Sequence, residues 1–244
     1  MRLDLVGVLA DARALWRRER ELLVPIAGMF FFVPMLAIVL LLANSGFPGD
    51  ATPEQLREAI AAFYEANIVA ILAANLAIAF GSFTVLNLFF QGGGRTLGEV
   101  LGITLRRFLP YLAIYLIASV LFSFGLSLLV LPGLFVFGRT WLAAPSFAAM
   151  PEKGPIHAFR EGWRRSAGFN WIVLLAAAMV TVIVAMLLIV VSSVLIGGLA
   201  TLVEARVALV IGHVVTALIG GLAWTGFALL RVAAYRRTEP SIGT

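Results

Sequence analysis

Leu105-Arg106-Arg107-Phe108 lies near the middle of the chain, where a pair of arginines ends an amphipathic stretch and a long apolar stretch follows. The same arrangement occurs at Leu15-Trp16-Arg17-Arg18 and at Trp163-Arg164-Arg165-Ser166. Basic residues that flank apolar stretches tend to stay on the cytoplasmic side of a membrane. The three arginine pairs therefore predict where membrane helices begin and which way they face.

The composition is that of a helical membrane protein. The 244 residues are 61% hydrophobic and 13% charged, whereas soluble domains average about 25% charged residues. The net charge of +5 does not indicate nucleic-acid binding, because the basic residues lie at the ends of apolar runs, where a membrane surface would meet them. The chain has no cysteine, which excludes disulfides and cysteine-based metal sites.

Six apolar segments predict an all-α protein with six transmembrane helices. A crossing needs about 20 residues, and five of the segments are long enough. The fourth is short, carries Arg139 and contains Pro145, which is expected to kink it. The predicted spans are 22–43, 67–90, 109–131, 133–150, 170–196 and 207–230.

The distribution of basic residues predicts the orientation. With six crossings, 15 of the 18 Lys and Arg residues fall on the side that holds both termini. This bias predicts a multi-pass protein of the bacterial inner (cytoplasmic) membrane with both termini cytoplasmic. If the fourth segment did not cross, the basic connection at 151–169 would fall on the other side and the bias would be lost.

Each arginine pair closes an amphipathic stretch that is expected to lie in the cytoplasmic membrane interface as a collar helix. The residues form a single membrane domain, 1–244, in three units of collar helix plus hairpin, which suggests a threefold repeat. The units cover about 1–90, 91–150 and 151–235, and a short cytoplasmic tail covers 236–244. One interpretation is that the collars bind anionic lipid headgroups or a partner protein. The other is that they only determine the membrane topology. The candidate headgroup-binding residues are Arg17, Arg18, Arg106, Arg107, Arg164 and Arg165.

The second span is expected to begin far outside the membrane. Thr52 can cap a helix, Pro53 suits its first position, and Gln55 completes a capping box with Thr52. No breaker follows, so one helix is predicted from 53 to 90.

Few polar residues lie inside the predicted spans, and each is a candidate for function because burial in lipid is costly. We expect them to converge in the outer half of the bundle around Arg139, with Glu204 as its counter-ion. The alternative is structural: Arg139 reaches the outer surface and the asparagines bond between helices. The candidate site consists of Arg139, Asn75, His213, Asn67 and Glu204.

Small residues recur every four positions in the sixth span, notably Gly212, Thr216 and Gly220. This spacing lets helix backbones approach closely. It predicts tight packing, either within the chain or between copies in a homo-oligomer.

A family resemblance rests on Leu131-Pro132-Gly133 through Arg139-Thr140-Trp141 to Pro145, followed by Glu152, Ala158-Phe159-Arg160-Glu161-Gly162-Trp163-Arg164-Arg165-Ser166 and Asn170-Trp171. This pattern resembles the membrane domain of some glycerophosphodiester phosphodiesterases and the YciC-type bacterial inner-membrane proteins. The resemblance implies a six-helix inner-membrane protein. It does not imply phosphodiesterase activity, because the catalytic His, Glu and Asp residues of those enzymes belong to a separate soluble barrel.

Enzymatic activity is not expected. The chain has two histidines, His157 and His213, and no pair of acids within the spans, so metal-assisted hydrolysis lacks its ligands. We predict no catalytic residue, no metal and no cofactor. The leading hypothesis is a non-catalytic membrane protein that organises or binds anionic lipid or partner proteins. The alternative is a transporter or channel for a small, anionic solute that uses the pocket around Arg139.

Overall fold

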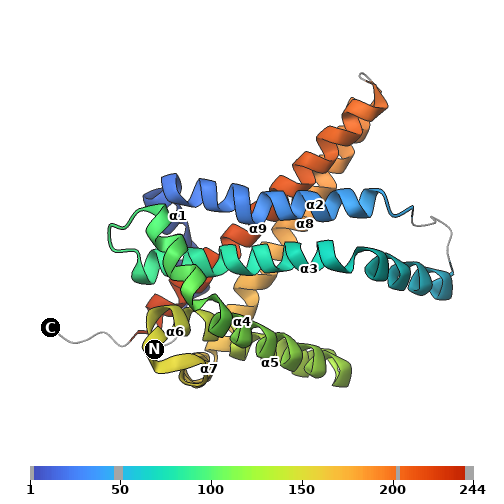
Figure 1. The fold of residues 1–244 in the computed structure, drawn as a ribbon. Helices are drawn as coiled ribbons and strands as arrows, with labels where there is room; N and C mark the ends of the chain where they lie inside the picture. The colour runs from blue at the N-terminus through green and yellow to red at the C-terminus, as the bar shows by residue number, and fades with distance from the viewer. Residues whose placement is uncertain (1–2, 47–51, 202–203, 240–244) are drawn as a thin grey trace.

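The computed structural model describes residues 3–46, 52–201 and 204–239 (Figure 1). These residues are almost entirely helical and none of them is in a β-strand. In chain order the elements are α1 (Leu5–Ala27), the π-helix η1 (Gly28–Phe32), α2 (Val33–Ala43), α3 (Pro53–Gln91), α4 (Leu97–Leu128), α5 (Val130–Thr140), α6 (Ala143–Ala149), the 3₁₀-helix η2 (Pro151–Lys153), α7 (Gly154–Arg165), α8 (Asn170–Leu199) and α9 (Ala205–Arg237).

Five helical stretches are long and apolar enough to cross a membrane. The first combines α1, η1 and α2, and the other four are α3, α4, α8 and α9. Four of them contain a predicted span whole, and α4 contains the third span up to Leu128, since its predicted last residues, 129–131, lie beyond the end of that helix. The protein therefore has the helix content and length of a multi-pass membrane protein.

The predicted fourth span is not one continuous helix. It is divided between α5 and α6, which have 11 and 7 residues, and a turn at Trp141 and Leu142 separates them. Pro145 explains the break, because proline has no backbone N–H to donate to the carbonyl of Trp141, four residues earlier. The expected kink is thus present as a break before the proline, and neither short helix reaches the about 20 residues of a crossing by itself.

The α4–α5 pair forms a tight helical hairpin (Figure 1). Gly125 of α4 and Gly133 of α5 touch: a Cβ on Gly125 would lie 2.8 Å from the Cα of Gly133. No side chain fits between the two backbones at this crossing. The contact turns α5 back along α4, toward the end of the molecule at which α4 begins.

The beginning of α1, the end of α9 and the connections before α4 and α8 lie at one end of the bundle (Figure 1). The backbone N–H of Leu3 donates to Oδ1 of Asn170 (3.0 Å), and Arg236 donates to the carbonyl of Phe89 (2.9 Å). We call this the arginine-rich end, and it holds Arg17-Arg18, Arg106-Arg107, Arg164-Arg165 and Arg236-Arg237.

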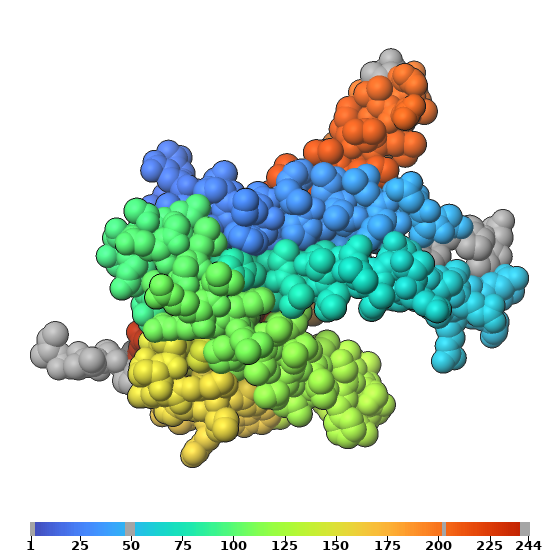
Figure 2. Space-filling view, in the orientation of Figure 1, coloured from blue at the N-terminus to red at the C-terminus, as the bar shows by residue number. Residues whose placement is uncertain are grey.

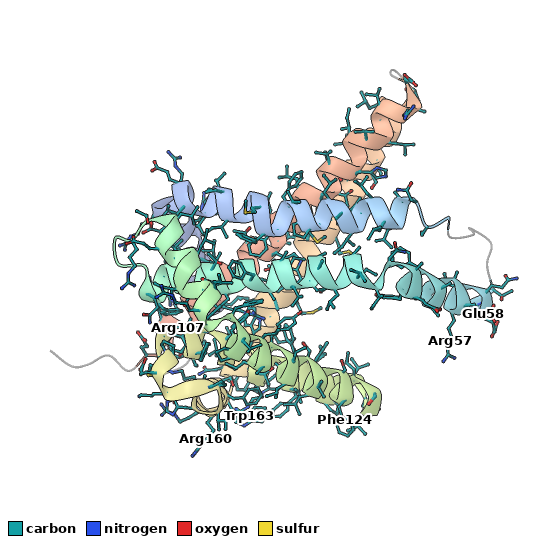
Figure 3. All side chains as sticks on the ribbon, viewed as in Figure 1. Arg57, Glu58, Arg107, Phe124, Arg160 and Trp163 are labelled. Carbon is teal, nitrogen blue, oxygen red and sulfur yellow. The ribbon has the colours of Figure 1, made fainter. Side chains whose placement is uncertain are left out.

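The long helix α3 confirms the predicted capping box. The N–H of Gln55 donates to Oγ1 of Thr52 (3.3 Å), and the N–H of Thr52 donates to Oε1 of Gln55 (2.9 Å). With 39 residues, α3 is about 58 Å long at 1.5 Å per residue. Its first turns, with Arg57 and Glu58, lie at the opposite end from Arg107 and Arg160 (Figure 3).

The three collar segments are helical but differ in form. A non-helical residue, Glu19 (φ −117°, ψ 22°), divides the first collar from the rest of α1. The second is the beginning of α4, which starts with a capping box between Thr96 and Glu99. The third, α7, is a separate helix. The second collar is therefore continuous with the span that follows it.

Protein packing is densest near the arginine-rich end. Phe83 of α3 stacks on Tyr111 of α4 with ring centroids 4.2 Å apart, and the ring of Phe147 in α6 lies 5.8 Å from that of Phe83. The far parts of α8 and α9 expose apolar side chains and stand apart from the other helices (Figure 2). Apolar surface of this extent is suited to lipid rather than water.

Candidate functional site

The structure does not bring the five intramembrane candidates together. Arg139 lies against α7 instead: its guanidinium carbon is 4.6 Å from the centre of the Trp163 ring, and its carbonyl accepts from Oγ of Ser166 (2.8 Å). Ser166 follows the third arginine pair. Arg139 is therefore at the arginine-rich end, which corrects its expected position in the outer half.

The side-chain amides of Asn75 and Asn67 donate hydrogen bonds within their own helix, α3. Nδ2 of Asn75 donates to the carbonyl of Ile71 (2.8 Å), and Nδ2 of Asn67 donates to the carbonyl of Phe63 (2.9 Å). Asn75 is exposed on the surface of α3. Bonds to the carbonyl four residues earlier replace the expected bonds between helices.

His213 and Glu204 also remain apart from Arg139. Glu204 is exposed just before α9, and His213 is partly buried two turns into that helix. Within the described ranges, no hydrogen bond or ion pair joins any two of the five candidates. The polar pocket expected around Arg139 is not assembled in this structure.

The six candidate headgroup-binding arginines fall into two groups. Arg17, Arg18 and Arg106 are exposed, and the side chain of Arg164 is 73% exposed. The side chain of Arg165 is 10% exposed, and Arg107 is partly buried. The first group reaches the surface of the arginine-rich end, where Arg18 also pairs with Glu19 (3.2 Å) and Arg164 with Glu161 (2.7 Å).

Arg165 connects two elements, α7 and the C-terminal end of α9. Its Nε donates to Oε1 of Glu161 (2.6 Å), and its Nη1 donates to Oγ1 of Thr238 (3.4 Å). Its guanidinium carbon lies 4.3 Å from the centre of the Tyr235 ring. This side chain fixes α7 against the C-terminal end of α9, so its role is structural.

Glu161 is the acid that organises the third arginine pair. Nε and Nη2 of Arg164 donate to its two carboxylate oxygens (2.9 and 2.7 Å), and Arg165 donates as well. The hydrogen bonds from Arg164, and then those from Arg165, lower the pKa of Glu161 to about 2, although burial acts in the opposite direction. The carboxylate therefore stays ionised at neutral pH.

The small residues of α9 pack inside the chain. A Cβ on Gly212 would lie 3.6 Å from Ile196 of α8, and one on Gly220 would lie 2.6 Å from Met35 of α2. Thr216 is partly buried between them along α9. Of the two arrangements that the sequence allows, packing within the chain is therefore observed.

A cavity of about 300 Å³ lies between α3 and the α4–α5 hairpin, with α9 on its third side. Most of its wall is apolar or aromatic. The polar residues in its wall include one charge, that of Arg231. The polar lining residues are Ser82, Tyr111, Tyr115, Ser119, Thr140, Trp141 and Arg231.

Two hydrogen-bond donors of this cavity are unused. Nε of Arg231 and Nε1 of Trp141 are buried and have no partner among the residues that the structure describes. Trp141 is 3% exposed, and the guanidinium carbon of Arg231 lies 5.8 Å from the centre of its ring. Both groups can donate and neither can accept. Arg231 gives the cavity wall a positive charge, while the two nitrogens themselves are covered by neighbouring atoms.

Arg231 is missing from the candidates predicted by sequence, because the predicted sixth span ends at residue 230. Helix α9 continues to Arg237, so Arg231 lies about 9 Å along the axis before Arg237. A signal for this was present. Arg231 stands between Ala228-Leu229-Leu230 and Val232-Ala233-Ala234, and an arginine with apolar residues on both sides belongs inside a helix packed in protein or lipid.

The described residues contain no cluster of three or more His, Asp or Glu side chains that could hold a metal ion. Comparisons with family models, curated proteins and solved structures find no match for the chain.

Proposed function

We propose that the protein is a non-catalytic, multi-pass protein of a bacterial inner membrane that binds anionic lipid at its arginine-rich end. The observation that carries the proposal is the separation of charge along the bundle. Exposed arginines gather at the arginine-rich end, whereas Glu58, near the start of α3, lies at the opposite end (Figure 3). Glu54 and Glu65 are exposed in the same first third of α3, and Glu204 is exposed just before α9.

The orientation follows from the same separation. Basic residues favour the cytoplasmic side, so the arginine-rich end and both termini face the cytoplasm. In this arrangement α5 and α6 together make the fourth of six crossings, returning the chain from the outer end of α4 to α7. The cytoplasmic leaflet is the one that carries anionic lipid, which complements the exposed arginines.

A surface groove near the first collar supports lipid binding. Arg13 and Trp16 lie at this groove of about 300 Å³, which continues over Leu222 and Leu229 of α9. A basic side chain beside an aromatic ring and an apolar channel matches the headgroup and the acyl chain of a lipid. The first collar and α9 therefore provide a surface for a headgroup and part of an acyl chain.

The resemblance to the membrane domain of glycerophosphodiester phosphodiesterases and YciC-type proteins supports the same proposal at the level of architecture. Transport around Arg139 has no comparable support, because none of the other four candidate residues contacts Arg139 in the described ranges.

The proposal is tested by removing exposed charge while keeping Arg165, at the cost of the exposed ion pairs Arg18–Glu19 and Arg164–Glu161. One variant combines four substitutions at exposed arginines: Arg17→Gln, Arg18→Gln, Arg106→Gln and Arg164→Gln. It retains the largely buried Arg165. Each arginine near an anionic surface contributes about 1 kcal/mol, so the loss of four should weaken phosphatidylglycerol binding by more than tenfold. Native mass spectrometry with phosphatidylglycerol and phosphatidylethanolamine measures this.

The matched control is Arg57→Gln, Arg206→Gln, which removes exposed arginines from the opposite end. It should retain the phosphatidylglycerol affinity of the unaltered protein. Equal affinity in the four-arginine variant and in this control would refute lipid binding at the arginine-rich end.

A further inference from the structure

We propose that the cavity around Arg231 binds a single-chain amphiphile with an oxyanion headgroup, a carboxylate or a phosphate monoester. This site is separate from the exposed arginines and does not depend on them. It lies among α3, α4, α5 and α9, with the headgroup at Arg231 and Trp141 and the chain along the apolar wall.

The need for a negative ligand comes from the unmatched charge. Arginine keeps its proton in proteins, so Arg231 is a permanent cation. No acidic residue lines the cavity, and no ion pair to Arg231 is found in the described part of the chain. Arg231 is partly buried in a largely apolar wall. A charge without an ionic partner is unfavourable there, and an anion bound at this place offsets the cost.

The free donors select an oxyanion. Arg231 and Trp141 line the same cavity, and Nε of the first and Nε1 of the second lack acceptors within the described residues. Two of the hydroxyls do not supply additional protons, since Oγ of Ser119 donates to the carbonyl of Tyr115 (2.8 Å) and Oγ1 of Thr140 donates to that of Val136 (2.9 Å). A carboxylate or phosphate has several oxygens, so it can pair with the Arg231 guanidinium and accept from both free donors once these two side chains turn their covered N–H groups toward the cavity.

The rest of the cavity selects an apolar chain. Its other walls include Ile78, Ile114, Phe122, Trp224 and Phe227. A volume of about 300 Å³ is at the small end of ligand pockets, which is more than a bare anion occupies and less than two acyl chains need. One short chain attached to the anion fills the space and keeps water from the apolar side chains.

The test uses the full chain in phosphatidylcholine nanodiscs, with empty nanodiscs as the blank. Dodecanoate labelled with ¹³C at its carboxyl carbon is the probe, and NMR distinguishes protein-bound from lipid-dissolved headgroup. We expect one saturable equivalent of bound dodecanoate. Dodecyl phosphate should displace it, whereas dodecanol and inorganic phosphate should not.

Three variants assign the binding to this cavity. Arg231→Gln should weaken dodecanoate binding at least tenfold, and Trp141→Phe, which keeps an aromatic side chain but replaces the indole with a smaller ring and loses the N–H, should weaken it about threefold to tenfold. Ala118→Trp should abolish binding by filling the cavity, since Ala118 lines it. Arg206→Gln, at the opposite end, is the control and should bind as the unaltered protein does.

The proposal is overturned if Arg231→Gln binds dodecanoate as well as the control. It is also overturned if dodecanol displaces the probe, which would make the cavity merely apolar, or if inorganic phosphate displaces it, which would make this a site for free anions. Should Arg231→Gln fail to fold, unchanged binding in both Trp141→Phe and Ala118→Trp would overturn it equally.

Discussion

Oε1 of Glu161 lies 2.6 Å from Nε of Arg165, and both side chains are 10% exposed. The sequence pattern predicts Arg165 as a lipid-binding arginine, but this contact makes it part of the protein interior. The neighbouring Arg164 shares the same carboxylate while remaining 73% exposed. One arginine of the pair thus supports the fold and the other is available to lipid.

Replacing Glu161 with glutamine should destabilise the protein, because it leaves the guanidinium of Arg165 without its anionic partner. Loss of charged hydrogen bonds at a largely buried site costs about 2–3 kcal/mol. The midpoint of thermal unfolding in detergent should fall clearly. Glu152→Gln, which alters an exposed acid in the preceding segment, should leave it nearly unchanged.

The same carboxylate should make stability depend on acid pH. The pKa of Glu161 is about 2 in the folded protein against an ordinary value of 4.5. Since the folded pKa is the lower one, the stabilisation is fully present above about pH 5 and is lost as the pH falls toward 2. Glu161→Gln should lack this component, so the difference in unfolding midpoint between the two proteins should shrink over that pH range. A constant difference would contradict the assigned pairing.

Arg165 and Arg164 should respond differently to the same substitution. Arg165→Gln removes contacts to Glu161, Thr238 and the ring of Tyr235, and should cost about 2–3 kcal/mol of stability. Arg164→Gln removes a mostly exposed ion pair, for which about 0.5 kcal/mol is typical. Thermal unfolding of the two single variants measures the contrast, and equal effects would mean that Arg165 does not connect α7 to α9.

Gly162 should not tolerate even a methyl group. A Cβ there would lie 2.5 Å from the backbone nitrogen of Ala143, so Gly162→Ala must push α7 away from α6. We expect a loss of about 1–3 kcal/mol, typical of overpacking. Gly102→Ala in α4 is the control, because nothing lies within 4 Å of its added Cβ and alanine favours a helix. A stable Gly162→Ala protein would contradict the close packing of α6 on α7.

The absence of cysteine allows a direct test of topology. Single cysteines at Glu152 and Arg57 place a thiol on each side of the proposed membrane without background labelling. In intact cells, a membrane-impermeant maleimide should label Arg57→Cys and leave Glu152→Cys unlabelled until the membrane is opened. Labelling of Glu152→Cys from outside would mean that α5 and α6 do not complete a crossing.

The parts of the fold that depend on local chemistry were predictable from sequence. The capping box of Thr52 and Gln55 and the unbroken helix to Gln91 follow from residues near one another in the chain. Five of the six apolar segments lie in long helices for the same reason. Pro145 was expected to kink the fourth span, and the structure has a break there. The break lies at Trp141 and Leu142 because the proline leaves the carbonyl of Trp141 without a backbone donor.

The candidate site was harder to predict, because it depends on packing between distant segments. Arg139 and Arg231 are both arginines next to apolar residues, and nothing local to either shows which one faces a cavity. The turn of α5 along α4 carries Arg139 to Trp163, and the continuation of α9 places Arg231 beside Trp141. The burial of Arg165 likewise depends on Tyr235, 70 residues further along the chain.

The most direct measurement of the central claim needs no substitution. The unaltered protein, extracted with its surrounding lipid into polymer-bounded nanodiscs, can be compared with the bulk membrane by lipid mass spectrometry. Binding of anionic lipid at the arginine-rich end predicts that anionic phospholipids are enriched in the nanodiscs, and that the enrichment decreases when the discs are washed at high salt. A lipid composition equal to that of the bulk membrane at low salt would contradict the account.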